Sequence, residues 1–244
     1  FGADFLETWL STVGHTRAHA QRRRALDGSP SRFVQIEPRM SLTGSQADDW
    51  IGIEPGVEGL IAASMVHTII AEQRVLVDGL AAEELDRIAG LVAGLSAEAV
   101  AGRTGVPAGT LVELARAFSD PNAGAGRTLA IGSGVSASGA DAAAAQVGIN
   151  LLNYVAGNIG RTVRFAAHAG WARASAYRDM HELGDAMRAG EVELAILHNV
   201  NPVHTMPGGA EFAEALDQVP LVVATSHFPD ETTARADLVL PTHT

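Results

Sequence analysis

Cysteine is absent from this sequence, and its absence excludes several kinds of chemistry from the chain. Disulfide bonds, iron–sulfur ligation and thiol nucleophiles all require a cysteine sulfur. No apolar run approaches the roughly 20 residues of a membrane-spanning helix, so we expect no membrane insertion by this segment. Basic residues are also few, because 17 Lys and Arg stand against 28 Asp and Glu, a net charge of −11. Phosphate neutralisation needs clustered cations, so nucleic acid is not an expected partner.

Apolar residues make up 47% of the 244 positions, enough to bury a core in two modest domains. Short β-rich runs alternate along the chain with segments of helical periodicity. This alternation predicts an α/β fold with two related, doubly wound parallel sheets. The stretch 119–127 is the expected linker between a first domain, 1–118, with a helical extension, and a second domain, 128–244. Both ends have the character of a fragment of a larger multidomain protein.

The expected elements follow from this alternation and from the punctuation by glycine and proline. The apolar pattern predicts helices from about residue 5 to 26 and over 57–75, 140–158, 177–192 and 208–219, with short helices in 80–119. It predicts strands over 32–38, 49–56, 128–134, 193–197, 220–228 and 237–241.

One phrase occurs twice in the sequence. LTGSQADDWIGI (42–53) and ETTARADLVLP (231–241) each contain a Thr, three residues, Ala-Asp and then a short apolar run. Each copy follows a β-rich run, and each is preceded further upstream by a polar loop, FGAD (1–4) or HNVNP (198–202). The repeated unit is strand, polar loop, helix, strand, T-x3-AD, strand. This unit is half of a nucleotide-binding α/β domain.

The polar residues of both copies are expected at the carboxyl ends of the strands, where such sheets bind their ligands. A Thr near a helix start can bind phosphate together with exposed backbone N–H groups, and a following Asp can accept hydrogen bonds from ribose or a base. The alternative is structural: each Thr caps a helical turn and each Asp begins the next strand. The residues concerned are Asp4, Glu37, Arg39, Thr43 and Asp48 in the first copy, and Asn201, Thr225, Ser226, Thr232 and Asp237 in the second.

A series of motifs resembles those of a known family. IEPR, T-x3-AD and IEPG resemble the "DPR … T…AD … PGTD" series of the molybdopterin-dependent oxidoreductases, the dimethyl-sulfoxide-reductase superfamily. LNYVAGNIGR resembles their "LN…GNIG" helix end. ILHNVNPVHTMP resembles their "GxNP" loop, and DETTARADLVLP resembles their "ET…ADVVLP" segment. The motifs occur in the family's order and cover nearly the whole chain.

The resemblance implies two α/β domains that hold the guanosine-diphosphate ends of two molybdopterin guanine dinucleotide cofactors. It implies no catalytic residue and no metal ligand in this segment, and it implies iron–sulfur clusters only elsewhere in the family's longer chain. The cofactor-binding residues implied by the motif matches are Asp4, Glu37, Pro38, Arg39, Asp48, Pro55 and Gly56 on one arm, Asn201, Pro202, Thr232 and Asp237 on the other, and Gly132 and Gly134 in a Gly-rich turn.

Four positions depart from the family pattern. Asp4 stands in place of an Asn, and Glu37 and Glu58 stand in place of Asp. Asn199 stands in place of a Gly, which is compatible with a positive φ because Asn adopts that conformation more readily than most residues. Acidic groups beside a diphosphate oppose its binding unless a cation or Arg39 intervenes.

One branch of the superfamily fits these departures. FGADFLETWLSTV and SHFPDETTARADLVLP resemble the molybdopterin-like large subunit of alternative complex III, a quinol-oxidising respiratory complex. The resemblance implies electron transfer without the molybdenum cofactor, the other subunits of a membrane-bound complex as partners, and the periplasmic face of the membrane.

Other functions stay open from the residues. The chain can be a fragment of a true molybdenum reductase of the polysulfide or tetrathionate type, or a non-redox nucleotide-binding α/β module. The glycines of GSGVSASG (132–139) lie outside the G-x-G-x-x-G register of an NAD site. His198, His204 and His227 follow strands, but their spacing does not by itself form a metal site.

Overall fold

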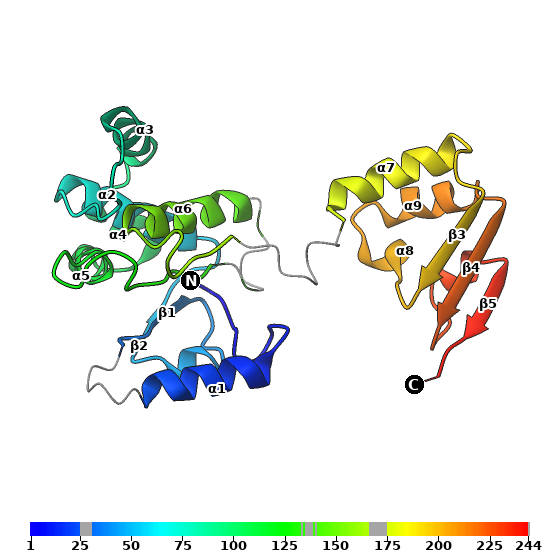
Figure 1. Cartoon of the computed structure of the whole chain (residues 1–244), viewed down its shortest axis with the longest axis horizontal. Helices are drawn as coiled ribbons and strands as arrows, with labels where there is room; N and C mark the ends of the chain where they lie inside the picture. The colour runs from blue at the N-terminus through cyan, green and yellow to red at the C-terminus, as the bar shows by residue number, and fades with distance from the viewer. Residues whose placement is uncertain (25–30, 133, 135–138, 140, 166–174, 244) are drawn as a thin grey trace. The chain divides into compact units, whose positions relative to one another are not determined.

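A computed structural model describes residues 1–24, 31–132, 134, 139, 141–165 and 175–243. The chain forms two compact units, Phe1–Phe165 and Ala166–Thr244 (Figure 1). Both contain helices and parallel strands, which confirms the predicted α/β class. Within the described residues, no helix is both long and apolar enough to cross a bilayer.

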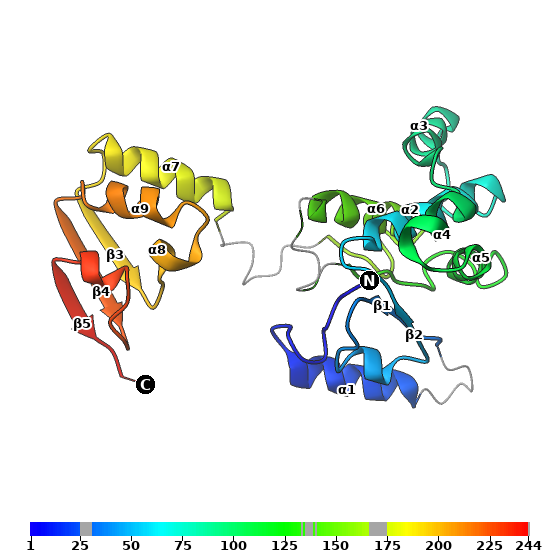
Figure 2. The ribbon, with the colours of Figure 1, turned by 180° about the vertical axis from the view of Figure 1, so that it is seen from behind.

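The first unit contains a two-stranded parallel sheet with helices on both sides. Figures 1 and 2 show α1 on one side of β1 and β2 and the pair α2 and α6 on the other. Val34 is paired with Asp49 and Ile36 with Ile51 across the strands. The elements of this unit are α1 (Thr12–Arg23), β1 (Val34–Glu37), η1 (Gly44–Gln46), β2 (Asp49–Gly52), α2 (Glu58–Ala71), α3 (Ala82–Val92), α4 (Ala97–Thr104), α5 (Ala108–Phe118) and α6 (Ala142–Val155).

The core of the first unit is centred on α2, whose broad apolar face was the basis for predicting a buried helix. Ile61, Val66 and Ile69 are fully buried there and belong to one cluster with Ile36 of β1 and Leu152 of α6. Burying such side chains contributes about 1.5–3 kcal/mol each, so the α2–α6 pair holds the unit together.

The second unit contains a three-stranded parallel sheet in the order β3-β4-β5. Helices α7 and α9 pack on one face of this sheet, with Met187, Phe212 and Leu216 in the core (Figure 1). The elements are α7 (Tyr177–Arg188), β3 (Leu194–His198), α8 (Pro202–Thr205), α9 (Gly209–Leu216), β4 (Leu221–Ser226), η2 (Thr233–Arg235) and β5 (Leu238–Pro241).

The two units divide at 165/166, whereas the composition predicts a linker at 119–127. The segment between these two places stays with the first unit because α6 packs along α2. A Cβ added at Gly59 of α2 would lie 2.7 Å from the Cα of Ala145, so the two helices are in close contact. Contact of this kind is not visible in composition.

The strand predicted over 128–134 is not formed by the described residues of that stretch. The side chain of Asn153 takes the place of a neighbouring strand. Its Oδ1 accepts from the backbone N–H of Ala130 at 2.9 Å, and its Nδ2 donates to the carbonyl of the same residue at 2.8 Å. Asn153 and Asn158 both belong to the LNYVAGNIGR motif. Nδ2 of Asn158 donates a hydrogen bond to Oδ1 of Asn153 at 3.1 Å and so helps to orient the Asn153 amide.

Candidate functional site

The polar loop of the first copy is closed by a buried pair, Asp4 and Thr43. The Thr43 hydroxyl donates to Oδ1 of Asp4 at 2.6 Å and accepts from the backbone N–H of Leu6 at 3.0 Å. Thr43 is fully buried and Asp4 is 5% exposed. The second carboxylate oxygen of Asp4, Oδ2, is buried and has no hydrogen-bond partner among the residues that the structure describes. The Thr hydroxyl therefore positions the loop and is not available to a phosphate.

The polar loop of the second copy contains the same arrangement with an amide in place of the carboxylate. The Thr232 hydroxyl donates to Oδ1 of Asn201 at 2.6 Å and accepts from the backbone N–H of Val203 at 3.2 Å. The other end of the amide, Nδ2, donates to the Glu231 carboxylate at 2.7 Å. This hydrogen bond, the backbone and nearby His204 hold the pKa of Glu231 below its usual value.

The backbone of the two loops also matches. Gly2 and Asn199 are both in the left-handed region, at φ 68° and 49°. Their N–H groups donate to the strand carbonyls of Ile36 and Thr225 at 2.8 and 2.9 Å. The positive φ predicted for Asn199 is confirmed. Pro202 is buried at the first position of α8, where its missing N–H leaves no helical bond unmade.

The Asp of each T-x3-AD phrase lies at the opposite end of its sheet from these loops. Asp48 accepts from the backbone N–H of Phe33, immediately before β1, at 2.7 Å. Asp237 accepts from that of Val222, near the start of β4, at 2.8 Å. The expectation that both carboxylates lie at the carboxyl ends is therefore wrong. Since parallel strands begin at one edge and end at the other, these residues join the amino ends of two strands.

Asp48 has a second partner in the first unit. Arg23, at the end of α1, donates to both of its carboxylate oxygens at 2.7 Å. The Arg23 hydrogen bond, together with the backbone N–H of Phe33, holds the pKa of Asp48 below its usual value. This ion pair links α1 to the sheet.

Glu37 ends β1 with its side chain turned into the protein, where it is 3% exposed. The Ser41 backbone N–H donates to Oε1 at 2.8 Å and the Gln35 amide donates to Oε2 at 2.9 Å. The indole N–H of Trp50 donates to Oε1 at 3.1 Å. These bonds satisfy the carboxylate inside the loop.

Arg39 and Gly56 lie on the surface near the carboxyl ends of β1 and β2. Within the described residues, no hydrogen bond or ion pair holds the Arg39 guanidinium, which leaves it free to meet an anion. Gly56 has φ 87° in the turn before α2, and open space surrounds its Cα. It is required by the backbone conformation of the turn.

A polar depression of about 490 Å³ lies at the same strand ends. Arg103, from the last turn of α4, lines it opposite Pro38 and Glu54. Sequence reasoning missed Arg103 because α4 is distant in sequence and its pattern indicated only a short helix. The remaining lining residues are Gly52, Ile53, Gly102, Thr104 and Gly105.

The two glycines of the Gly-rich turn are required by close packing against the protein itself. A Cβ at Gly134 would lie 2.2 Å from the carbonyl oxygen of Gly2, and one at Gly132 would lie 2.3 Å from Cδ1 of Ile149. The turn therefore lies directly against the loop that contains Asp4. Residues 133 and 135–138 of that turn fall outside the described residues.

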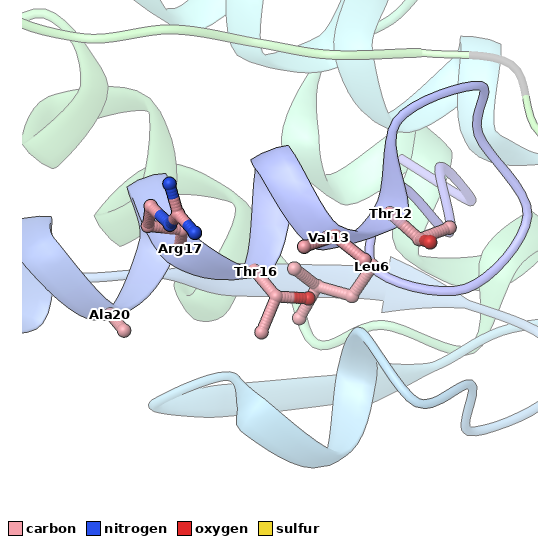
Figure 3. Close-up of a pocket in the computed structure, with 6 residues that line it drawn as sticks. All are labelled: Leu6, Thr12, Val13, Thr16, Arg17 and Ala20. Atoms are coloured by element: carbon pink, nitrogen blue, oxygen red, sulfur yellow. The ribbon is translucent and has the colours of Figure 1, made fainter.

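A second depression, of about 380 Å³, follows the outer side of α1 (Figure 3). Leu6 and Val13 give it an apolar floor, and Arg17 is the charged residue at its side. Thr12, Thr16 and Ala20 complete the lining. Among the described residues that line it there is no carboxylate and no histidine.

The three histidines considered as metal ligands have separate partners. His198 lies 2.6 Å from the Thr225 hydroxyl, and His227 lies 3.1 Å from the Thr242 carbonyl. His204 lies 3.8 Å from Glu231. Across the residues that the structure describes, no group of three or more His, Asp or Glu side chains is placed to hold a metal ion.

A family model described as molybdopterin oxidoreductase matches residues 2–244. The chain belongs to the molybdopterin oxidoreductase family. The structure of acetylene hydratase from Pelobacter acetylenicus, a chain 18% identical in sequence, matches with a TM-score of 0.67 over 96% of this chain and 38% of that one. At this identity the likeness shows the fold alone.

Two curated proteins extend the comparison. The menaquinone reductase, molybdopterin-binding-like subunit of Nitratidesulfovibrio vulgaris is 31% identical over 252 residues, 98% of this chain and 35% of that protein. Perchlorate reductase subunit alpha of Dechloromonas aromatica is 32% identical over 76 residues, 30% of this chain and 8% of that protein. The chain thus spans about a third of the first relative's length.

The family implies a molybdopterin cofactor, and several of the residues expected at its nucleotide arms are paired within the protein or placed elsewhere in this chain. Both Thr hydroxyls are buried, and both T-x3-AD carboxylates lie at the far end of their sheets. At the first loop, Oδ2 of Asp4 is buried and receives no hydrogen bond from the described residues. A carboxylate oxygen offers no hydrogen-bond donor to a diphosphate. Among the described residues, Arg39 and Arg103 are cations at the same strand ends.

Proposed function

We propose that this chain is the core of a cofactor-poor, molybdopterin-like subunit that acts in respiratory electron transfer within a quinol-oxidising membrane complex. The observation that carries the proposal is Asp4, which places a buried carboxylate oxygen, without a hydrogen-bond partner in the described part of the chain, where the second copy has the Asn201 amide. The similarity to a menaquinone reductase subunit whose name reads "molybdopterin-binding-like" supports the quinone-linked role.

In this role the chain supplies structure and contact surfaces, and electrons pass through groups bound elsewhere. The chain has no cysteine, so iron–sulfur clusters of such a subunit have their ligands in other parts of the protein. The partners proposed are the other subunits of the complex.

Metal and pterin analysis of the purified full-length protein tests the proposal. We expect iron without stoichiometric molybdenum or tungsten, and no fluorescent pterin after oxidative extraction. Stoichiometric molybdenum with a pterin would contradict the proposal. It would support instead a true molybdenum reductase, the reading favoured by the segment similar to perchlorate reductase subunit alpha. Absence of iron, molybdenum and pterin together would favour a non-redox module.

A further inference from the structure

The helix α1 packs on the sheet of the first unit without a buried side chain of its own. Figures 1 and 2 show it along one side of β1 and β2. Its residues are exposed except for Thr12, His15 and His19, which are partly buried and lie on one face of the helix. The core cluster built on α2 contains no residue of α1 among those described. The docking of α1 therefore rests mainly on this face and on the Arg23–Asp48 ion pair.

The two histidines of this face form a ring cluster with Phe5, Trp9 and Phe33. The centre of the His15 ring lies 5.7 Å from that of Trp9 and 6.2 Å from that of Phe5. The centre of the His19 ring lies 5.6 Å from that of Phe33 and 6.5 Å from that of Phe5. These distances are typical of aromatic rings in packing contact. The imidazoles thus serve as the apolar contact surface of α1.

The ring cluster suits a neutral imidazole better than a charged one. Within the described residues, the ring nitrogens of His15 and His19 make no hydrogen bond and no ion pair. An imidazolium in such a place loses water without gaining an acceptor. The pKa of His19 lies below its ordinary value of 6.5, first because of burial and second because of Arg23 on the same helix. Asp48 acts in the opposite direction, but its carboxylate is already bonded to Arg23 at 2.7 Å.

The other charged groups on the segments that carry the cluster are bonded elsewhere or lie in solvent. In the segment before α1, Asp4 is bonded within its own loop and Glu7 is exposed. Before β1, Arg32 donates to the carboxylates of Asp49 and Glu113. The helix α1 itself carries arginines and no carboxylate. A proton added on the inner face of α1 therefore increases the charge of a helix that is already cationic.

We propose that α1 is a pH-sensitive cover of the first sheet, and that protonation of His19 in the ring cluster releases it in mildly acidic solution while the core around α2 stays folded. The released helix binds the proton more readily than the docked one, so docking is fully favourable above about pH 6.5 and weakens as the pH falls below it. The ion pair is not the trigger, because the pKa of Asp48 lies below its usual value and the carboxylate stays ionised. The device does not depend on whether a cofactor is bound.

Amide hydrogen exchange in the full-length protein, measured at about pH 7.5 and about pH 5.5, tests the proposal. The rates are corrected for the intrinsic pH dependence of exchange, and peptides from residues 12–23 are compared with peptides from α2. We expect the protection of the α1 amides to fall at least about threefold at the lower pH, and that of α2 to stay unchanged. Equal protection of α1 at both pH values would overturn the proposal. Higher protection at the lower pH would also overturn it, since the rings would then attract the imidazolium.

Substitution of the histidine identifies the group that titrates. His19→Phe keeps a ring in the cluster and removes the titration, so α1 of this variant is expected to be equally protected at both pH values. His19→Leu repeats the test with an aliphatic side chain. His181→Phe is the matched control, because His181 also contacts a ring, that of Tyr177 at 4.9 Å, but lies on α7. Its α1 is expected to respond to pH as in the natural protein. Acid release that persists in both His19 variants would assign the effect to another group and overturn the proposal.

Discussion

At the scale of single residues, Asp4 and Asn201 define the chemical difference between the two copies. Each accepts a hydrogen bond from a buried Thr hydroxyl at 2.6 Å. The second atom of the amide donates to a carboxylate, whereas the second oxygen of Asp4 receives no hydrogen bond from the residues described. A buried polar oxygen without a hydrogen-bond partner costs free energy because it has lost its contact with water.

The variant Asp4→Asn tests this difference. Asn keeps the acceptor for the Thr43 hydroxyl and removes the buried charge, so we expect the free energy of unfolding to change by less than about 1 kcal/mol or to rise. The variant Asp4→Ala leaves the Thr43 hydroxyl without its acceptor and is expected to lose about 1–3 kcal/mol. Urea unfolding of both variants measures the two values. Equal losses would show that the charge itself is required.

At the scale of elements, each T-x3-AD phrase makes hydrogen bonds at both ends of its sheet. Its Thr holds the polar loop at one end, and its Asp joins the amino ends of two strands at the other. The 3-10 helices η1 and η2 span the distance between them. The structural alternative, in which the Asp begins the next strand, describes this geometry better than the nucleotide alternative does.

The crossing of α2 and α6 gives a prediction at this scale. A Cβ at Gly59 would lie 2.9 Å from that of Ala145, so Gly59→Ala forces the helices apart and is expected to destabilise the protein by about 1–3 kcal/mol. Gly90, inside α3, has open space around its Cα. Gly90→Ala is therefore expected to stabilise by about 0.4–1 kcal/mol. Thermal unfolding compares the variants, and a loss of stability in both would contradict the role assigned to the crossing.

At the scale of the whole molecule, the chain contains two hydrophobic cores with no residue in common among those described. One is built on α2, α4, α5 and α6, and the other on α7, α9 and their sheet. Because each unit buries its own core, each is expected to lose its structure separately.

Core truncations in each unit test this independence. Leu216→Ala empties a fully buried position of the second core and is expected to destabilise that unit by about 2–5 kcal/mol. Hydrogen exchange should then rise in α9 and β4 and stay unchanged in α2 and α6. Ile69→Ala, in the first core, should show the reverse pattern. A common rise in both units after either substitution would show that they unfold together.

Much of the fold was predictable because local pattern and turn chemistry decide it. The alternation of apolar runs predicts the parallel α/β class, and the Asn at position 199 predicts a positive φ, which the structure confirms. The strand predicted over 128–134 does not form among the described residues, and the local pattern could not reveal this. The backbone of Ala130 is hydrogen-bonded by the side chain of Asn153, which comes from a helix and not from a neighbouring strand.

The sequence by itself determined the α/β class, the internal repeat and the family, since these depend on periodicity and on the order of motifs. Only the tertiary structure decided what the repeated residues do. The direction of a side chain depends on which end of a strand carries it and on what is buried beside it. Thr43 and Asp48 stand close together in the sequence, yet one closes a loop at one end of the sheet and the other joins two strands at the opposite end.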